Sequence, residues 1–214
     1  HIEAVVRGCK GPLVIGDMPF MSYNTSIREA IHNAGRLMKE GGCDAIKLEG
    51  GLNFVPTVEA IVTAGIPVQG HIGLTPQTAS ALGGFKMQGK DAAAAKQIID
   101  DARGLENAGA FSIVLEAVPA PLGQLVAEAV RVPIIGIGAG PDVDGQVLVT
   151  HDMVGLFDKF IPKFVKQYTQ IRTIILDAMQ AYKKDVQDSV FPGPEHSFKM
   201  PAETLDQLKA IIKK

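Results

Sequence analysis

Residues 45–49 read Ala-Ile-Lys-Leu-Glu, a short apolar run that ends on a carboxylate. The same arrangement recurs along the chain: a glycine closes a helical stretch, a few apolar residues follow, and a polar or glycine-rich turn ends the run. Short apolar runs of this length, bounded by turn signals, are typical of buried strands in a parallel sheet. The other runs cover 13–16 before Asp17, 66–70 before His71, 112–115 before Glu116 and 132–137 before Gly138.

Helical patterns fill the intervals between these runs. Ser26 and Glu29 form a capping-box pattern, in which a hydroxyl and a carboxylate each satisfy an otherwise unpaired N–H. An apolar stripe follows, made of Ile27, Ala30, Ile31, Ala34, Leu37 and Met38. Glycines 41 and 42 end that helix.

The remaining helices are predicted with less detail. One begins at Asp91 and runs to Gly109, and shorter ones cover 56–64 and 122–130. Residues 146–157 are expected to hold the last strand, turn or helix start. The segments 161–184 and 202–213 are expected to form a helical tail.

Alternation of strands and helices with short links predicts a parallel sheet with helices outside. A closed barrel needs eight strands and about 250 residues, whereas this sequence offers five or six candidate strands in 214 residues. The prediction is an α/β fold of the (β/α)8 TIM-barrel type, seen without its first two βα units. Residues 1–214 would form a single domain, with a C-terminal helical extension from about 161. An open doubly wound sheet would place dinucleotide-binding glycines after the first strand, and residues 16–19 do not supply them.

Two βα units correspond to roughly 50–60 residues. We therefore expect a segment of that length to precede His1 in the complete polypeptide, and its mass would test this.

Composition excludes several classes of protein. Hydrophobic residues make up 46% and charged residues 21%, so the chain can bury a core, and a net charge of −2 argues against a nucleic-acid binder. No apolar run approaches the ~18–20 residues of a membrane span. Cys9 and Cys43 fit a reducing compartment and are interpreted as free small hydrophobic residues, not as a disulfide or a zinc site.

In a barrel of this type the catalytic side chains stand at the carboxyl ends of the strands. Here those ends carry Asp17, Glu49, His71 and Glu116, which a barrel would bring to one rim. Lys47 lies two residues before Glu49, so both side chains face the same way. Lys47 is expected to form a salt bridge to a rim acid or to contact substrate.

Two carboxylates on one rim suit Mg²⁺, which prefers oxygen ligands and keeps room for water and substrate oxygens. A 2-oxo acid could chelate such a metal, which would acidify the neighbouring C–H and stabilise an enolate. A third carboxylate could accept that proton. Glu116 is the candidate base, because the apolar residues around it would keep its basicity high.

Each of these features also has a purely structural interpretation. Asp17 could only cap a turn, Glu49 could be a loop acid, and His71 could be a buried histidine with satisfied hydrogen bonds. The glycine-rich run 136–140 could bind an anion or only permit a tight turn. His151-Asp152 is interpreted as a surface turn instead of a catalytic pair, and His32 as a solvated residue.

Taken together, seven motifs resemble the ketopantoate hydroxymethyltransferase family. The resemblance covers essentially all of the chain and thins after about Tyr168. The motifs are residues 16–20 with Ser22-Tyr23, 45–51, 70–77, 84–90, 115–119, 135–140 and 144–149.

The resemblance implies a (β/α)8 barrel in pantothenate and coenzyme A biosynthesis, usually a homodecamer in the cytoplasm. The implied reaction transfers a hydroxymethyl unit from 5,10-methylenetetrahydrofolate to 3-methyl-2-oxobutanoate and gives 2-dehydropantoate through a Mg²⁺-stabilised enolate. The implied partners are the 2-oxo acid and folate, with no nucleic acid and no membrane. A mitochondrial location is the alternative for a eukaryotic source, since an upstream segment could hold a transit peptide.

Carried over by motif, Asp17 and Glu49 resemble metal ligands, and Asp17, Lys47 and His71 resemble substrate contacts. Glu116 resembles the base. The family also has a Gly-Asp-Ser segment near the end of its second strand, which supplies another metal ligand. That segment does not occur in this sequence.

Two alternatives stay open. One is a Mg²⁺-dependent lyase or mutase of the phosphoenolpyruvate mutase and isocitrate lyase type, which a cysteine-rich catalytic loop would favour. The other is a catalytically dead barrel kept as an assembly subunit, which a metal titration would distinguish from an enzyme.

Overall fold

The computed structural model describes residues 1–81 and 83–212. The chain divides into two compact units. We call His1–Val149 with Pro162–Val165 the sheet unit, and Thr150–Ile161 with Lys166–Lys214 the tail unit. This division does not decide whether the chain is one barrel domain with an extension, and that description stays a prediction.

The sheet unit is built on six parallel strands that follow one another in chain order across the sheet. The strands are β1 (Ile15–Asp17), β2 (Ala45–Lys47), β3 (Val68–Gly73), β4 (Ser112–Glu116), β5 (Ile134–Ile137) and β6 (Gly145–Gln146). Each strand pairs with the next, as in a (β/α) barrel, whereas a doubly wound sheet reverses its order part-way. The chain therefore forms a partial (β/α) barrel, and the predicted fold class is confirmed.

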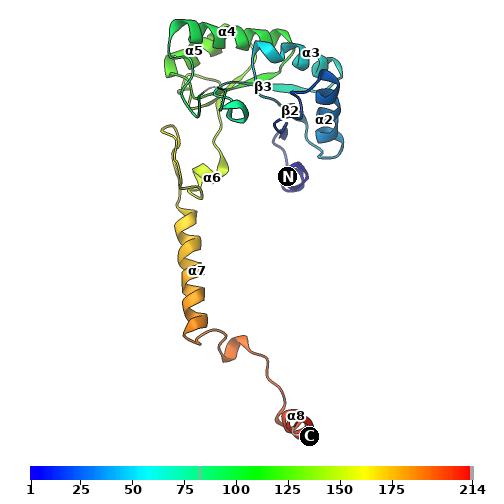
Figure 1. The fold of residues 1–214 in the computed structure, drawn as a ribbon, viewed down its shortest axis with the longest axis vertical. Helices are drawn as coiled ribbons and strands as arrows, with labels where there is room; N and C mark the ends of the chain where they lie inside the picture. The colour runs from blue at the N-terminus through cyan, green and yellow to red at the C-terminus, as the bar shows by residue number, and fades with distance from the viewer. Residues whose placement is uncertain (82, 213–214) are drawn as a thin grey trace. The chain divides into compact units, whose positions relative to one another are not determined.

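Helices connect the strands and pack on the sheet. They are α2 (Ile27–Lys39), α3 (Val55–Thr63), α4 (Ala92–Asn107) and α5 (Ala120–Ala129), preceded by α1 (Ile2–Gly8). Single turns of 3₁₀ helix, η1 (Leu52–Phe54) and η2 (Pro76–Thr78), lie in the loops after β2 and β3. Figure 1 shows α3, α4 and α5 along the same side of the sheet, as expected for the outer layer of a barrel.

The two faces of the strands have different roles. A Cβ added at Gly70 would lie 2.7 Å from Leu105 of α4, so this position of β3 faces the helices. Its neighbours Gln69 and His71 therefore face the opposite side, which is the barrel interior. Gln69 Nε2 donates to Ser112 Oγ of β4 at 2.9 Å, so polar side chains pair across this interior face.

Apolar residues fill the layer between sheet and helices, and their burial stabilises the fold. The largest fully buried side chains include Tyr23, Met18, Ile46, Leu48, Ile61, Ile72, Leu105, Ile113, Leu115 and Ile134. Cys43 is buried, Cys9 is partly buried, and both are free thiols, as predicted.

Helix α2 confirms half of the predicted capping box. Ser26 Oγ accepts a hydrogen bond from Glu29 N at 3.2 Å, but the Glu29 carboxylate contacts the Thr25 hydroxyl instead of the Ser26 backbone. Ala30 and Ala34 of the apolar stripe are fully buried. His32 is exposed, as predicted.

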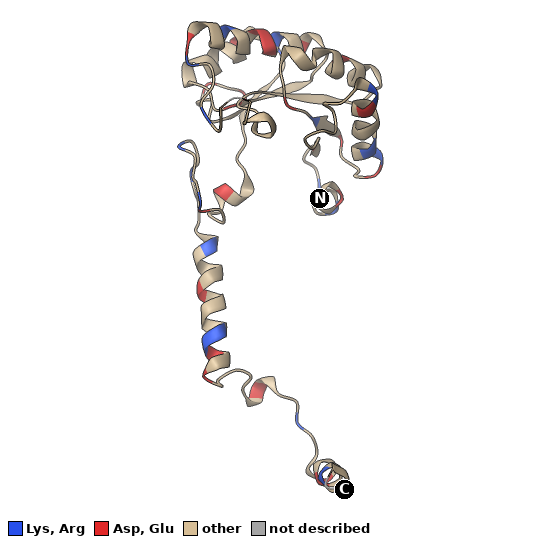
Figure 2. Cartoon of the chain, viewed as in Figure 1, with Lys and Arg blue, Asp and Glu red and all other residues tan. Residues whose placement is uncertain are grey.

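The tail unit contains α6 (Thr150–Met153), α7 (Ile171–Gln187), the 3₁₀ turn η3 (Pro194–His196) and α8 (Ala202–Ile212). The final helix is confirmed up to Ile212, and Lys213 lies outside the described residues. Figure 2 shows both signs of charge interspersed along α4 and α7. Within the described residues, no helix combines the length and apolarity that crossing a membrane requires.

The segment 161–184, predicted to be largely helical, is helical from Ile171 onward, whereas residues 161–170 do not form a helix. Backbone N–H groups near the start of α7 bond to a different segment: Tyr168 N donates to Met153 O at 2.8 Å, and Ile171 N donates to Val154 O at 3.0 Å. Groups used in this way cannot form the i to i−4 bonds of a helix.

Candidate active site

The predicted site residues lie on four consecutive strands at or near their carboxyl ends, except that His71 lies inside β3, two residues before its end at Gly73. Asp17 ends β1 and is in register with Lys47, which ends β2. Glu49 follows two residues later, and Gly50 N donates to the carbonyl oxygen of His71 on β3 at 2.9 Å. Glu116 ends β4 opposite Gly73. The strand register therefore brings to one rim residues that lie far apart in the sequence.

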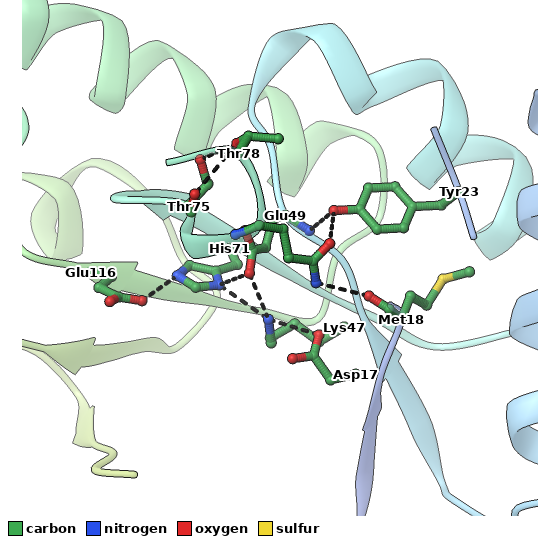
Figure 3. A network of polar contacts seen from close by, with 10 residues as sticks. Asp17, Met18, Tyr23, Lys47, Glu49, His71, Thr75, Thr78 and Glu116 are labelled. Carbon is green, nitrogen blue, oxygen red and sulfur yellow. Dashed lines mark hydrogen bonds and ion pairs between the residues drawn. The ribbon is translucent and has the colours of Figure 1, made fainter. Parts of the chain in front are cut away.

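These side chains form one continuous polar network, shown in Figure 3. Lys47 Nζ lies 2.9 Å from Asp17 Oδ1 and 3.9 Å from Glu49 Oε1. His71 Nδ1 lies 3.1 Å from Lys47 Nζ and 3.8 Å from Glu49 Oε1. On the other side of the ring, His71 Nε2 lies 3.0 Å from Glu116 Oε2. Lys47 thus forms the salt bridge to a rim acid that was one of its two predicted roles.

His71 occupies the centre of this network. A lysine ammonium only donates hydrogen bonds, so its contact with Nδ1 assigns the acceptor role to that nitrogen and leaves the proton on Nε2. Nε2 then faces the Glu116 carboxylate, but the two are not aligned for a hydrogen bond, and no described residue is a hydrogen-bond partner of this buried atom. The alternative that His71 is a core histidine with satisfied hydrogen bonds stays open beside the functional one.

Solvent access differs among the acids. Asp17 is open, with 56% of its side chain exposed, whereas the Glu116 side chain is 13% exposed and that of Glu49 is 4% exposed. Burial raises the pKa of Glu49, against the lowering effects of His71, of the Gln77 N–H and of Lys47. The site therefore joins an exposed carboxylate to two largely enclosed ones.

Two residues without a predicted role, Tyr23 and Gln77, form hydrogen bonds to Glu49 and to each other. Tyr23 OH donates to Gln77 Oε1 at 2.9 Å and accepts from Glu49 N at 3.2 Å. Gln77 N donates to Glu49 Oε2 at 3.0 Å, and Gln77 Nε2 donates to Met18 O at 2.9 Å. Burial raises the pKa of Tyr23 to about 12, so its hydroxyl keeps its proton at neutral pH. Both residues belong to motifs noticed in the sequence, but neither carries a charge that would indicate a role.

The loop after β3 is anchored on the backbone of Glu116 and its neighbour. Leu74 N donates to Glu116 O at 2.8 Å, and Gln88 N donates to Ala117 O at 2.9 Å. Ala117 has a φ of 51°, a left-handed conformation that costs a non-glycine residue about 1–2 kcal/mol. The backbone at the predicted base is thus held in a strained conformation by a loop that also carries Gln77.

The rim offers the carboxylate oxygens that Mg²⁺, the metal expected from the sequence resemblance, prefers as ligands. Asp17 and Glu49 both face Lys47 Nζ, so their oxygens converge on one region. Proteins often hold Mg²⁺ with one or two carboxylates and leave the remaining positions to water and substrate. In residues 1–81 and 83–212, no group of three or more His, Cys, Asp and Glu side chains is arranged to hold a metal. A cation bound at this rim would therefore have Asp17 and Glu49 as its ligands from the described residues.

The other sequence features lie outside this network. Gly138 and Gly140 have positive φ values, and a Cβ at Gly138 would lie 2.5 Å from Phe164, so this run allows a tight turn with close packing. Binding of an anion there stays untested. His151 is exposed in α6, as expected for a surface position.

Comparison with known proteins places this geometry in a family. The family model described as ketopantoate hydroxymethyltransferase matches residues 1–194. The chain belongs to the ketopantoate hydroxymethyltransferase family. The resemblance inferred from the motifs is thereby confirmed.

Relatives of the family match most of the chain. One, named 3-methyl-2-oxobutanoate hydroxymethyltransferase, from Syntrophobacter fumaroxidans, is 58% identical over 200 residues, which cover 94% of this chain and 71% of the relative. A protein of the same name from Heliobacterium modesticaldum is 57% identical over 203 residues, covering 95% of this chain and 74% of the relative.

A solved structure supports the fold alone. A protein from Burkholderia cenocepacia J2315, provisionally described as a phosphonomutase, superposes with a TM-score of 0.52 at 13% identity. The match covers 88% of this chain and 73% of that one. At this identity the similarity does not favour mutase chemistry over the family identified above.

Proposed function

We propose that this chain catalyses transfer of a hydroxymethyl group to 3-methyl-2-oxobutanoate, giving 2-dehydropantoate. The observation that carries the proposal is the network of Asp17, Lys47, Glu49, His71 and Glu116 at one rim of the sheet. Family membership and the names of relatives that are 57–58% identical support the same activity. We infer that 5,10-methylenetetrahydrofolate is the donor and that the reaction belongs to pantothenate and coenzyme A biosynthesis.

Lys47 and His71 are the groups suited to bind the substrate. A 2-oxo acid is an anion, and Lys47 provides a cation on the inner face of the sheet. His71 provides a ring N–H at Nε2, which lacks an aligned partner among the described residues and can donate to a substrate oxygen. These two donors would orient the keto acid beside Glu116.

Asp17 and Glu49 would hold Mg²⁺. When bound, the metal supplies Lewis acidity to the keto oxygen, which raises the acidity of the adjacent C–H. Lys47 is paired with Asp17 and lies near Glu49, so it balances part of the negative charge of both carboxylates.

Glu116 would remove the proton from C3 of the substrate. As the C3–H bond breaks, its electron pair moves toward the carbonyl, and the carbon then bonds to the methylene carbon of the folate donor. One of the two C–N bonds of that methylene carbon would break as the C–C bond forms, and water would displace the second and leave its hydroxyl group on the carbon. The proton taken by Glu116 and the remaining proton of the water would go to the two folate nitrogens, and tetrahydrofolate would be released.

The decisive experiment isolates proton removal. Glu116→Gln keeps the side-chain shape but cannot accept the proton, so exchange of the C3 hydrogen with solvent deuterium should slow by about 10²–10⁴-fold without folate. Binding of Mg²⁺ and of the keto acid should stay near the parent values. Glu128→Gln, on an exposed position of α5, is the matched control and should exchange at the parent rate.

Two results would contradict this role. Exchange at the parent rate in Glu116→Gln, with no product formed, would mean that Glu116 acts after proton removal. Loss of Mg²⁺ binding would make Glu116 a ligand, and His71 would be the next candidate for the base.

We further propose that the chain works in a homo-oligomer, as a decamer, in the cytoplasm. This extension rests on family membership alone. Sedimentation of the purified protein tests the assembly state.

A further inference from the structure

Tyr23 connects two of the rim loops through one hydroxyl group. Tyr23 is 1% exposed, and its ring packs edge-on against Phe54, with ring centroids 5.3 Å apart. The hydroxyl uses both of its hydrogen-bonding functions, because it accepts from the backbone N–H of Glu49 and donates to the Gln77 amide. The ring is thus fixed by packing while its polar end is fixed by two partners.

Gln77 connects the same region to β1. Its amide oxygen accepts from Tyr23, so its amide nitrogen must point the other way, and there it donates to the carbonyl oxygen of Met18. Met18 directly follows Asp17. The backbone N–H of Gln77 also donates to the Glu49 carboxylate at 3.0 Å. Gln77 therefore contacts the backbone next to Asp17 and the side chain of Glu49.

We propose that Tyr23 and Gln77 act as a positioning pair, which sets the relative placement of the Asp17 and Glu49 carboxylates. The inference rests on the proposed function, because it assigns the pair to the acids that would hold Mg²⁺. The contacts connect the loop after β1, the residue after β2 and the loop after β3. They add side-chain bonds to the backbone bonds from Met18 N to Lys47 O and from Gly50 N to His71 O. In Figure 3, Tyr23 and Met18 lie on the side of Glu49 away from Glu116.

A metal site is sensitive to such partners, since the groups that orient its ligands typically change metal affinity or activity by about 10–100-fold when removed. Neither Tyr23 nor Gln77 has to touch the metal to have this effect. A merely structural role would lower thermal stability and leave the Mg²⁺ affinity of the folded protein unchanged.

The test uses two substitutions that keep side-chain volume. Tyr23→Phe retains the contact with Phe54 and removes the hydroxyl, whereas Gln77→Met removes the amide and leaves the backbone N–H that serves Glu49. The matched controls are Tyr182→Phe in α7 and Gln124→Met in α5. Tyr182 is exposed, and Gln124 makes only an exposed hydrogen bond to Glu128. Calorimetric titration with Mg²⁺ gives affinity, thermal unfolding without metal gives stability, and turnover gives kcat and KM separately.

Each single variant should weaken Mg²⁺ binding by about 10–100-fold and lower kcat more than it raises KM. The double variant should be close to the worse single variant, because the two residues act through a shared hydrogen bond. The controls should match the parent.

The possible outcomes separate failure of the proposed function from failure of the positioning pair. A parent protein that neither binds Mg²⁺ nor turns over the keto acid contradicts the proposed function and this assignment with it. A parent protein that binds Mg²⁺ normally, together with pair variants of unchanged affinity, overturns only the positioning pair. A lower unfolding temperature with unchanged affinity leads to the same conclusion, because it assigns the pair to stability alone.

Discussion

The helices of the sheet unit and of the tail unit both carry apolar residues at helical spacing, but they differ in how much of that apolar surface is buried. In the sheet unit, α2 to α5 all place residues in the buried core, and their apolar faces meet the strands. In the tail unit, none of the described residues of α7 or α8 is buried. Their large apolar side chains are open, with Ile174 64% exposed and Ile211 70% exposed.

The difference shows what an amphipathic pattern specifies. Apolar residues at helical spacing favour a helix with one apolar face, but they do not supply the surface that covers that face. In the sheet unit, parallel strands supply it. Within the described residues of the tail unit, no sheet covers the apolar faces of α7 and α8. Their apolar side chains therefore contribute less to the free energy of folding than those of α2 to α5.

The largest expected effect concerns the acids at the rim. Glu49→Gln and Asp17→Asn should each weaken Mg²⁺ binding by at least about 100-fold, because even outer partners of a metal site typically cost about 10–100-fold. Asp177→Asn, the same change in α7, should leave affinity unchanged. Calorimetric titration measures all three variants. EDTA should abolish turnover and Mg²⁺ should restore it, and full activity in chelator would refute the metal-based proposal.

A smaller effect is expected from loss of apolar volume. Ile113 on β4 is fully buried, so Ile113→Ala should lower the free energy of unfolding by about 2–5 kcal/mol. Ile174→Ala removes the same atoms from an exposed position of α7 and should change it by less than about 0.5 kcal/mol. Chemical denaturation compares the two. Equal losses would mean that α7 buries Ile174 in solution, and the contrast between the units would fail.

The smallest effect is expected at the helix starts. Ser26 caps α2 by accepting from Glu29 N, so Ser26→Ala should cost about 1 kcal/mol. Gln170 at the start of α7 makes no such side-chain bond, and Gln170→Ala should be nearly neutral. Thermal and chemical unfolding would detect the difference. A comparable cost at both positions would show that capping is not what distinguishes them.

Much of the fold was predictable because strands and helices alternate in a strict order. Apolar runs ending at Asp17, Glu49, His71 and Glu116 predicted four of the strands and the rim on which these residues meet. The geometry of a parallel sheet carries this inference, since the carboxyl ends of its strands lie on the same edge.

The rest depends on contacts between distant segments. Helix α1 has no side-chain cap, and its seven residues are too few for a periodic pattern to reveal a helix. Its Ile2 packs close to Gly16 and Gly41, where any side chain would collide with it. The Tyr23–Gln77 contact joins residues 54 positions apart in two loops. Neither periodicity nor charge marks such a pair before the chain has folded.

The order of the strands along the chain has a consequence for folding during translation. Each strand from β2 onward pairs with the one made immediately before it, so every pairing closes a connection of modest length. The sheet can therefore extend strand by strand as the chain leaves the ribosome, and the four strands that carry the rim acids and His71 can assemble before the tail unit has been translated.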